Sequence, residues 1–124
     1  YAIGNFIRDG ITGGPIIVKG DGKPYRSYLY ASDLTIWLWT ILFQGEVCQP
    51  YNVGSSCELT LSDLANSVAN VFHPKPEIKI SKPSKRKSKA ERYVPSTKRA
   101  NNKLGVKEWV RLNETIKKTV LWYS

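Results

Sequence analysis

The sequence predicts a small α/β domain of the mixed α+β kind, built from short strands and about five helices. Two observations support this fold class. Short apolar runs bounded by glycine or proline alternate with longer segments whose apolar residues recur at helical spacing. In addition, 41% of the 124 residues are hydrophobic, which is enough for the core of one domain. We therefore expect residues 1–124 to form a single domain.

The first part of the chain predicts one helix and two strands. Residues 2–11 place their apolar side chains on one face of a helix. Those side chains are Ile3, Phe6, Ile7 and Ile11. The run PIIVKG, residues 15–20, is typical of a buried strand and ends at a Gly-Asp-Gly turn. The alternating run YRSYLY, residues 25–30, predicts a second short strand.

A second helix is predicted from about residue 33 to 43. Ser32 or Asp33 would be its N-cap, and Gly45 would end it. Residues 47–54, VCQPYNVG, are expected to be extended. Four aromatic side chains of this region are expected in the core or at a contact between domains, namely Tyr28, Tyr30, Trp37 and Trp39.

A third helix is predicted within residues 55–72, with Thr60 or Ser62 as its cap. Its apolar face consists of Leu61, Leu64, Ala65, Val68 and Phe72. The run PEIKI, residues 76–80, predicts a brief strand.

Two helices are predicted near the end of the chain. The first would be capped by Ser96 and stopped by Gly105. The second covers residues 111–123 and is amphipathic. Its apolar face consists of Leu112, Ile116, Val120 and Tyr123.

The chain carries a formal net charge of +9, which favours an anionic partner such as nucleic acid, a membrane surface or a phosphorylated ligand. The surplus is concentrated in residues 82–92, KPSKRKSKAER, which hold six basic residues and one acidic residue. Like charges in such a run repel one another and have few apolar groups to bury. We expect this segment to be a flexible loop.

Several kinds of site are not indicated. Cys48 and Cys57 have no further Cys or His at ligand spacing, so no metal site is expected. We expect free thiols, buried or partly buried, although a disulfide remains open. The single histidine, His73, is expected to be structural or at the surface. No apolar run approaches the ~20 residues that cross a membrane, and no signal peptide is recognisable, so we expect a cytoplasmic protein.

Four motifs occur in a fixed order: PIIVKGDGKPYRSYLYASDL, PYNVGS, RYVPSTKRANNKLGV and LNETIKKTVLWY. Together they resemble the C-terminal part of the extended short-chain dehydrogenases/reductases. More narrowly, they resemble the NAD-dependent nucleotide-sugar epimerases and dehydratases of the dTDP-glucose 4,6-dehydratase type. The resemblance covers nearly the whole chain. It implies a substrate-binding domain that grips the diphosphate of a dTDP- or UDP-sugar.

The resemblance also implies site residues. Arg26 stands where the family places an arginine on the diphosphate, and Arg92 resembles a second arginine that closes on the same group. A guanidinium suits this task because its planar fork of donors pairs with phosphate oxygens. The residue types alone leave open that Arg26 is a plain strand arginine. They equally leave open that Arg92 is one more charge in a solvated loop.

Three further residues are implied to be substrate-binding. Ile17 and Lys19 stand where the family's strand lies along the nucleoside, and Asn52 matches an asparagine close to the bound sugar nucleotide. Asn52 is also a residue type common in turns. Relatives commonly read R-P-G-D before the second arginine, where this chain has the lysine-rich KRKSKAER.

The family's catalytic half is absent from this sequence. None of the seven tyrosines has a lysine four residues later, and no G-x-G-x-x-G follows a strand. We therefore expect a fragment that lacks the N-terminal Rossmann domain, has no catalytic residue and binds no cofactor itself, whereas the parent enzyme uses NAD. The surface that faced the missing domain would be apolar, and a homodimer could form through it.

Two other classes of function remain alternatives. A basic nucleic-acid-binding module would explain the net charge, and its binding would weaken with salt. However, the basic residues gather in one loop and do not alternate with exposed aromatic side chains, so no stacking surface for bases is evident. An autonomous protein-interaction domain is the third possibility.

Overall fold

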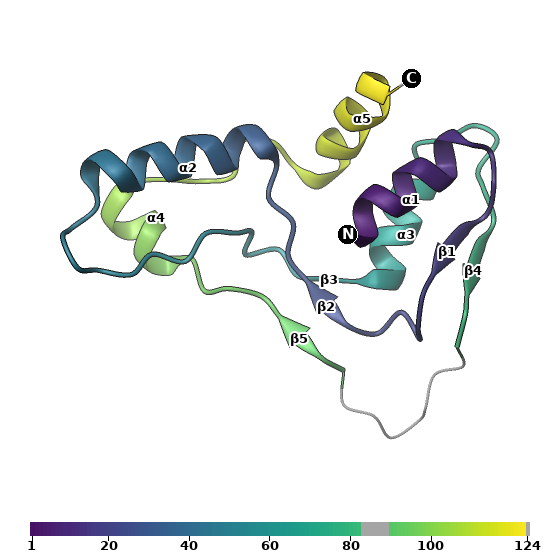
Figure 1. Ribbon diagram of the computed structural model, residues 1–124, viewed down its shortest axis with the longest axis horizontal. Helices are drawn as coiled ribbons and strands as arrows, with labels where there is room; N and C mark the ends of the chain where they lie inside the picture. The colour runs from purple at the N-terminus through teal and green to yellow at the C-terminus, as the bar shows by residue number, and fades with distance from the viewer. Residues whose placement is uncertain (83–89, 124) are drawn as a thin grey trace.

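The computed structural model describes residues 1–82 and 90–123, and within them it contains five helices and five short strands (Figure 1). The helices are α1 (Ala2–Ile11), α2 (Ala31–Gln44), α3 (Leu61–Ala69), α4 (Lys98–Leu104) and α5 (Leu112–Tyr123). The strands are β1 (Ile16–Val18), β2 (Tyr25–Arg26), β3 (Leu59–Thr60), β4 (Ile78–Ile80) and β5 (Arg92–Tyr93). The predicted mixed α/β class is confirmed.

The strands form two small sheets. Strand β1 pairs in parallel with β4, with Ile16 opposite Ile78. In the second sheet β2 lies between β3, which is antiparallel to it, and β5, which is parallel to it. Segments far apart in the sequence therefore meet on the two sides of β2.

The larger core forms where α1, α3 and α5 pack with β1 (Figure 1). Its buried side chains are Phe6, Ile7, Ile16, Val18, Leu64, Ala65, Val68, Ala69 and Ile116. The apolar faces expected for the first, third and last helices supply most of these residues. Periodicity was sufficient to find them because each face packs within this one cluster.

A smaller core joins α2 to α4 and to the segment that follows α4. Trp37 is 1% exposed and packs with Ala100 and Val106. The Trp37 indole N–H donates to the Lys107 carbonyl at 3.0 Å. The buried Asp33 carboxylate accepts the backbone N–H groups of residues 109 and 110 at 2.9 and 3.0 Å. Two side chains of α2 thus hold this segment against the helix.

Two of the expected helix caps are wrong. Helix α2 begins at Ala31, and the side chains of Ser32 and Asp33 lie inside its first turn. Asp33 bonds to a distant segment instead, which no local pattern could show. Helix α4 has Thr97 at its N-cap in place of Ser96.

Other predicted helix ends are confirmed. Thr60 caps α3 and forms a capping box with Asp63, so Thr60 rather than Ser62 is the cap. Gly45 and Gly105 lie at the C-caps of α2 and α4, and Gly105 has the left-handed conformation with φ of 66°. Helix α3 is shorter than expected because it ends at Ala69, before Phe72.

Three further expectations need correction. Only Tyr25 and Arg26 of the predicted strand 25–30 are in a strand, and residues 47–54, which were expected to be extended, begin with a turn in which Cys48 has φ of 60°. Both cysteines are free as expected, but they are exposed and not buried. Trp39 is 56% exposed and so lies outside the core, and its expected place at a contact between domains stays a prediction. The lysine-rich residues 83–89 lie outside the described residues.

Candidate functional site

Arg26 lies on β2, the central strand of its sheet, and its side chain is about one-third exposed. One guanidinium nitrogen, Nη1, donates to the Tyr25 carbonyl at 2.8 Å. The other, Nη2, forms an ion pair with Glu91 Oε2 at 2.9 Å. Strands on both sides position the backbone of Arg26, and its charged end is held at the surface.

The turn that leads into β2 packs against the start of α3. The backbone N–H of Ser62 donates to the Gly22 carbonyl at 3.1 Å, and that of Leu61 to the Pro24 carbonyl at 3.1 Å. Gly22 has φ of 73°, and a Cβ atom there would clash with the Ser62 hydroxyl. Glycine is therefore required for this turn to approach the helix and set the position of β2.

Arg92 lies on β5, next to β2, but its side chain points to the opposite face of the sheet. The register aligns Arg92 with Tyr25, and Arg26 with Tyr93. Successive side chains of a strand alternate between faces, so the two arginines do not share a face. Arg92 instead forms an ion pair with Glu58 at 2.6 Å. The structure brings both arginines to one sheet but gives each its own carboxylate.

Ile17 and Lys19 project outward from β1 and its end, and both are exposed. They line a hollow of about 300 Å³ between β1 and α1. Arg8 and Asp9 of α1 line the same hollow, and Asp9 Oδ2 accepts the Ile17 backbone N–H at 3.3 Å. The hollow thus combines apolar walls with two cations and one carboxylate.

Asn52 lies in a segment that runs alongside β2 and alongside the residues that follow β5. Its amide donates to the Ser96 carbonyl at 3.1 Å. The Ser55 backbone N–H donates to the Ser27 hydroxyl at 3.0 Å. Gly54 packs against Pro95, with no room for a Cβ. These contacts hold the segment against the residue that follows Arg26.

Two kinds of residue around Arg26 were missed by sequence reasoning. Tyr28 is half-buried, and burial raises its pKa above the ordinary tyrosine value, while the nearby charge of Arg26 opposes this increase. Glu58 and Glu91 are the carboxylates that pair with the two arginines. The only signal for Glu91 was its place as the one acidic residue of a basic run.

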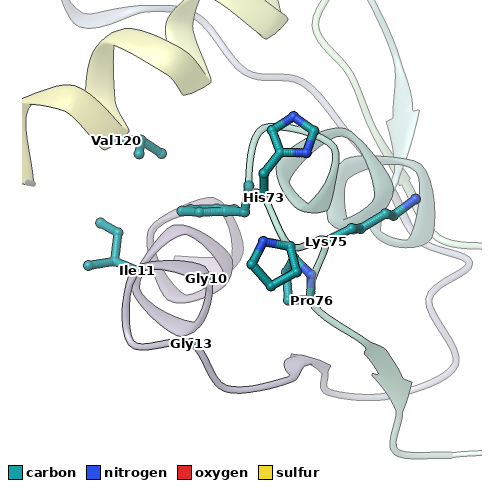
Figure 2. Close-up of a pocket in the computed structure, with 9 residues that line it drawn as sticks. Gly10, Ile11, Gly13, His73, Lys75, Pro76 and Val120 are labelled. Atoms are coloured by element: carbon teal, nitrogen blue, oxygen red, sulfur yellow. The ribbon is translucent and has the colours of Figure 1, made fainter.

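A hollow of about 540 Å³ lies elsewhere, between the end of α1, the connection from α3 to β4, and Val120 of α5 (Figure 2). His73 and Lys75 stand at its edge, and neither a carboxylate nor any predicted site residue lines it. His73 is exposed, which agrees with the expected surface position. This hollow is therefore not joined to the candidate site.

Neither a metal centre nor a membrane span is indicated within the described residues. No group of three or more His, Cys, Asp or Glu side chains in them could hold a metal ion. Among the helices of residues 1–82 and 90–123, none is long and apolar enough to span a membrane. The candidate site is centred on Arg26, because Arg26 lies on the central strand of its sheet and its charged end reaches the surface.

The domain's fold is that of proteins that modify nucleotide sugars. A UDP-glucose 4-epimerase from Thermotoga maritima, solved with UDP-glucose, matches with a TM-score of 0.85 and 23% identity, over 99% of this chain and 39% of that one. A dTDP-glucose 4,6-dehydratase from Bacillus anthracis, solved with NAD, matches with a TM-score of 0.80 and 19% identity, over the same shares of the two chains.

A family model described as GDP-mannose 4,6 dehydratase matches residues 5–119. The chain therefore belongs to this family of nucleotide-sugar dehydratases and epimerases, within the extended short-chain dehydrogenases/reductases.

Curated relatives agree with this assignment. The chain is 33% identical to a trifunctional UDP-glucose 4,6-dehydratase/UDP-4-keto-6-deoxy-D-glucose 3,5-epimerase/UDP-4-keto-L-rhamnose-reductase of Arabidopsis thaliana, over 98% of this chain and 18% of that protein. It is 24% identical to the dTDP-glucose 4,6-dehydratase of Haemophilus influenzae, over 94% of this chain and 38% of that protein. The chain thus spans less than two fifths of the length of these relatives.

Proposed function

We propose that this chain is the substrate-binding part of an NAD-dependent nucleotide-sugar dehydratase or epimerase, and that Arg26 binds the diphosphate of a UDP- or dTDP-sugar. The observation that carries the proposal is the position of Arg26. Its backbone is held between two strands, while its guanidinium reaches the surface and pairs with a single carboxylate oxygen. A guanidinium offers further donors in a planar fork, which suits the several oxygens of a diphosphate.

The nucleoside would lie along β1 and the adjoining hollow. Ile17 supplies an apolar surface there, and Lys19 and Arg8 supply positive charge. Asn52 would face the sugar nucleotide from the segment that is held beside β2. Both a uracil and a thymine base fit this arrangement. The relatives named for UDP-sugars are more similar to this chain than the one named for a dTDP-sugar, which favours UDP.

Catalysis and NAD binding would belong to another part of the protein. The residues present do not fit NAD, because β1 leads through the turn at Gly20–Gly22 into another strand, and no helix follows it to receive a diphosphate. The family's Tyr-x-x-x-Lys pair is also absent from this sequence. We infer that a separate Rossmann domain supplies both, in a protein of the cytoplasm.

Substitution of Arg26 in the full-length protein tests the proposal. Arg26→Ala should weaken UDP binding about 10- to 150-fold, because a hydrogen bond to a charged group contributes about 1.5–3 kcal/mol. Titration calorimetry with UDP would measure the loss, and uridine, which has no phosphate, should bind both proteins equally.

Arg99→Ala is the matched control, since Arg99 is an exposed arginine of α4 that bonds to the Pro50 carbonyl. It should leave UDP affinity unchanged. Unchanged UDP affinity in Arg26→Ala, with a large fall in melting temperature, would show that Arg26 is structural and would contradict the proposal.

A further inference from the structure

Glu91, the residue just before the neighbouring strand β5, holds the charged end of Arg26. The Glu91 carbonyl accepts the Tyr25 backbone N–H at 2.8 Å, which fixes the main chain of Glu91 against β2. Its carboxylate then reaches Arg26 Nη2 at 2.9 Å. Glu91 immediately precedes Arg92 on β5, so alternation along the strand places its side chain on the Arg26 face of the sheet.

The contact between Glu91 and Arg26 is weak enough for a ligand to replace it. It joins one guanidinium nitrogen to one carboxylate oxygen, and the Glu91 side chain is 73% exposed. Exposed ion pairs of this kind are weak, because water screens the charges and both side chains lose freedom. A diphosphate carries more negative charge than a carboxylate and offers more oxygens to the same fork of donors.

We propose that Glu91 occupies the anion position of Arg26 in the absence of ligand and that a phosphate oxygen displaces it on binding. Glu91 is therefore an internal competitor that lowers the affinity of the site for a diphosphate. This inference rests on the proposed function, because it requires that Arg26 contacts the diphosphate. It adds that the Glu91 carboxylate, just before Arg92, determines the affinity of the site for the ligand.

Glu91→Gln tests the inference in the full-length protein. The substitution keeps the shape of the side chain and removes the charge that competes for Arg26. The affinity for UDP should rise about two- to fivefold, which is the range expected when an exposed ion pair no longer has to be broken. Titration calorimetry with UDP would measure the increase, and the affinity for uridine should stay the same.

Two further variants make the result specific. Glu46→Gln removes an exposed glutamate that pairs with Lys103 at 3.0 Å, on the α2–α4 side of the molecule. It changes the net charge equally and should leave UDP affinity unchanged. In the Arg26→Ala background, Glu91→Gln should give no increase, because the competed group is missing.

The outcomes separate the two proposals. If Arg26→Ala weakens UDP binding but Glu91→Gln does not strengthen it, the competitor role of Glu91 is overturned and the proposed function stands. An equal increase in Glu46→Gln would attribute the gain to net charge and would also overturn that role. If Arg26→Ala leaves UDP affinity unchanged, the proposed function fails and the inference fails with it. Melting temperatures of all variants would confirm that each is folded.

Discussion

Arg92 shows how the position of one side chain depends on strand register. The sequence resemblance implied that Arg26 and Arg92 close on one diphosphate, and the structure does place them on adjacent strands. Their side chains nevertheless point to opposite faces, where Arg92 pairs with Glu58. A shift of one residue in the pairing would reverse this, because side chains alternate along a strand.

We therefore predict that Arg92→Ala affects ligand binding much less than Arg26→Ala. Removing a charge from the other face of the sheet changes only the long-range field, so UDP affinity should fall by about twofold or less. Calorimetry on the full-length protein would measure both variants under the same salt. Equal losses would show that both arginines reach the diphosphate, as the resemblance first implied.

Asp33 is the buried polar residue on which the smaller core depends. It is 1% exposed, and its Oδ2 accepts two backbone N–H groups from the segment after α4. Asp33→Ala would remove the acceptor of both N–H groups, so the free energy of unfolding should fall by about 1–3 kcal/mol.

Denaturant titration of the chain would measure this change. Asp33→Asn retains an acceptor oxygen and the side-chain volume, so it should lower the free energy of unfolding less than Asp33→Ala. If Asp33→Ala left stability unchanged, the two hydrogen bonds would contribute nothing to holding the segment on α2.

At the scale of elements, α2 leaves most of its apolar side chains exposed. Trp37 is its only buried apolar side chain. Its exposed side chains include Leu38, Trp39, Leu42 and Phe43, which are 52–76% exposed. The rings of Trp39 and Phe43 stack with their centroids 5.5 Å apart. An apolar face of this size is typical of a surface that another domain covers.

We predict that the isolated 124-residue chain self-associates through this face of α2. Replacing both Trp39 and Phe43 by Glu should make the chain monomeric, because the charges would be costly to bury between two copies. Sedimentation velocity would measure the change, and circular dichroism would check that the helix content is retained. A wild-type chain that stays monomeric up to its solubility limit would contradict the prediction.

At the scale of the whole molecule, the chain spans less than two fifths of the length of the relatives described above. The sequence has neither the glycine-rich fingerprint nor the Tyr-x-x-x-Lys pair that the family uses. We predict that the isolated chain does not bind NAD appreciably and does not turn over UDP- or dTDP-glucose. Calorimetry and a turnover assay would check this, and micromolar NAD binding would contradict it.

The sequence by itself determined the fold class, the five helices and the family. These follow from local periodicity, from turn residues such as Gly105, and from motifs whose order is preserved along the chain. The cap at Thr60 was also predictable, because a capping box depends on residues only three apart.

Only the tertiary structure decided which carboxylate meets which arginine, and that Asp33 bonds to a segment 76 and 77 residues away rather than to its own helix end. It also decided which Trp of α2 is buried and where strands only two residues long begin and end. Each of these depends on contacts between distant parts of the chain. Local preferences of a kcal/mol or less are too weak to determine them, and the packing of the whole domain overrides them.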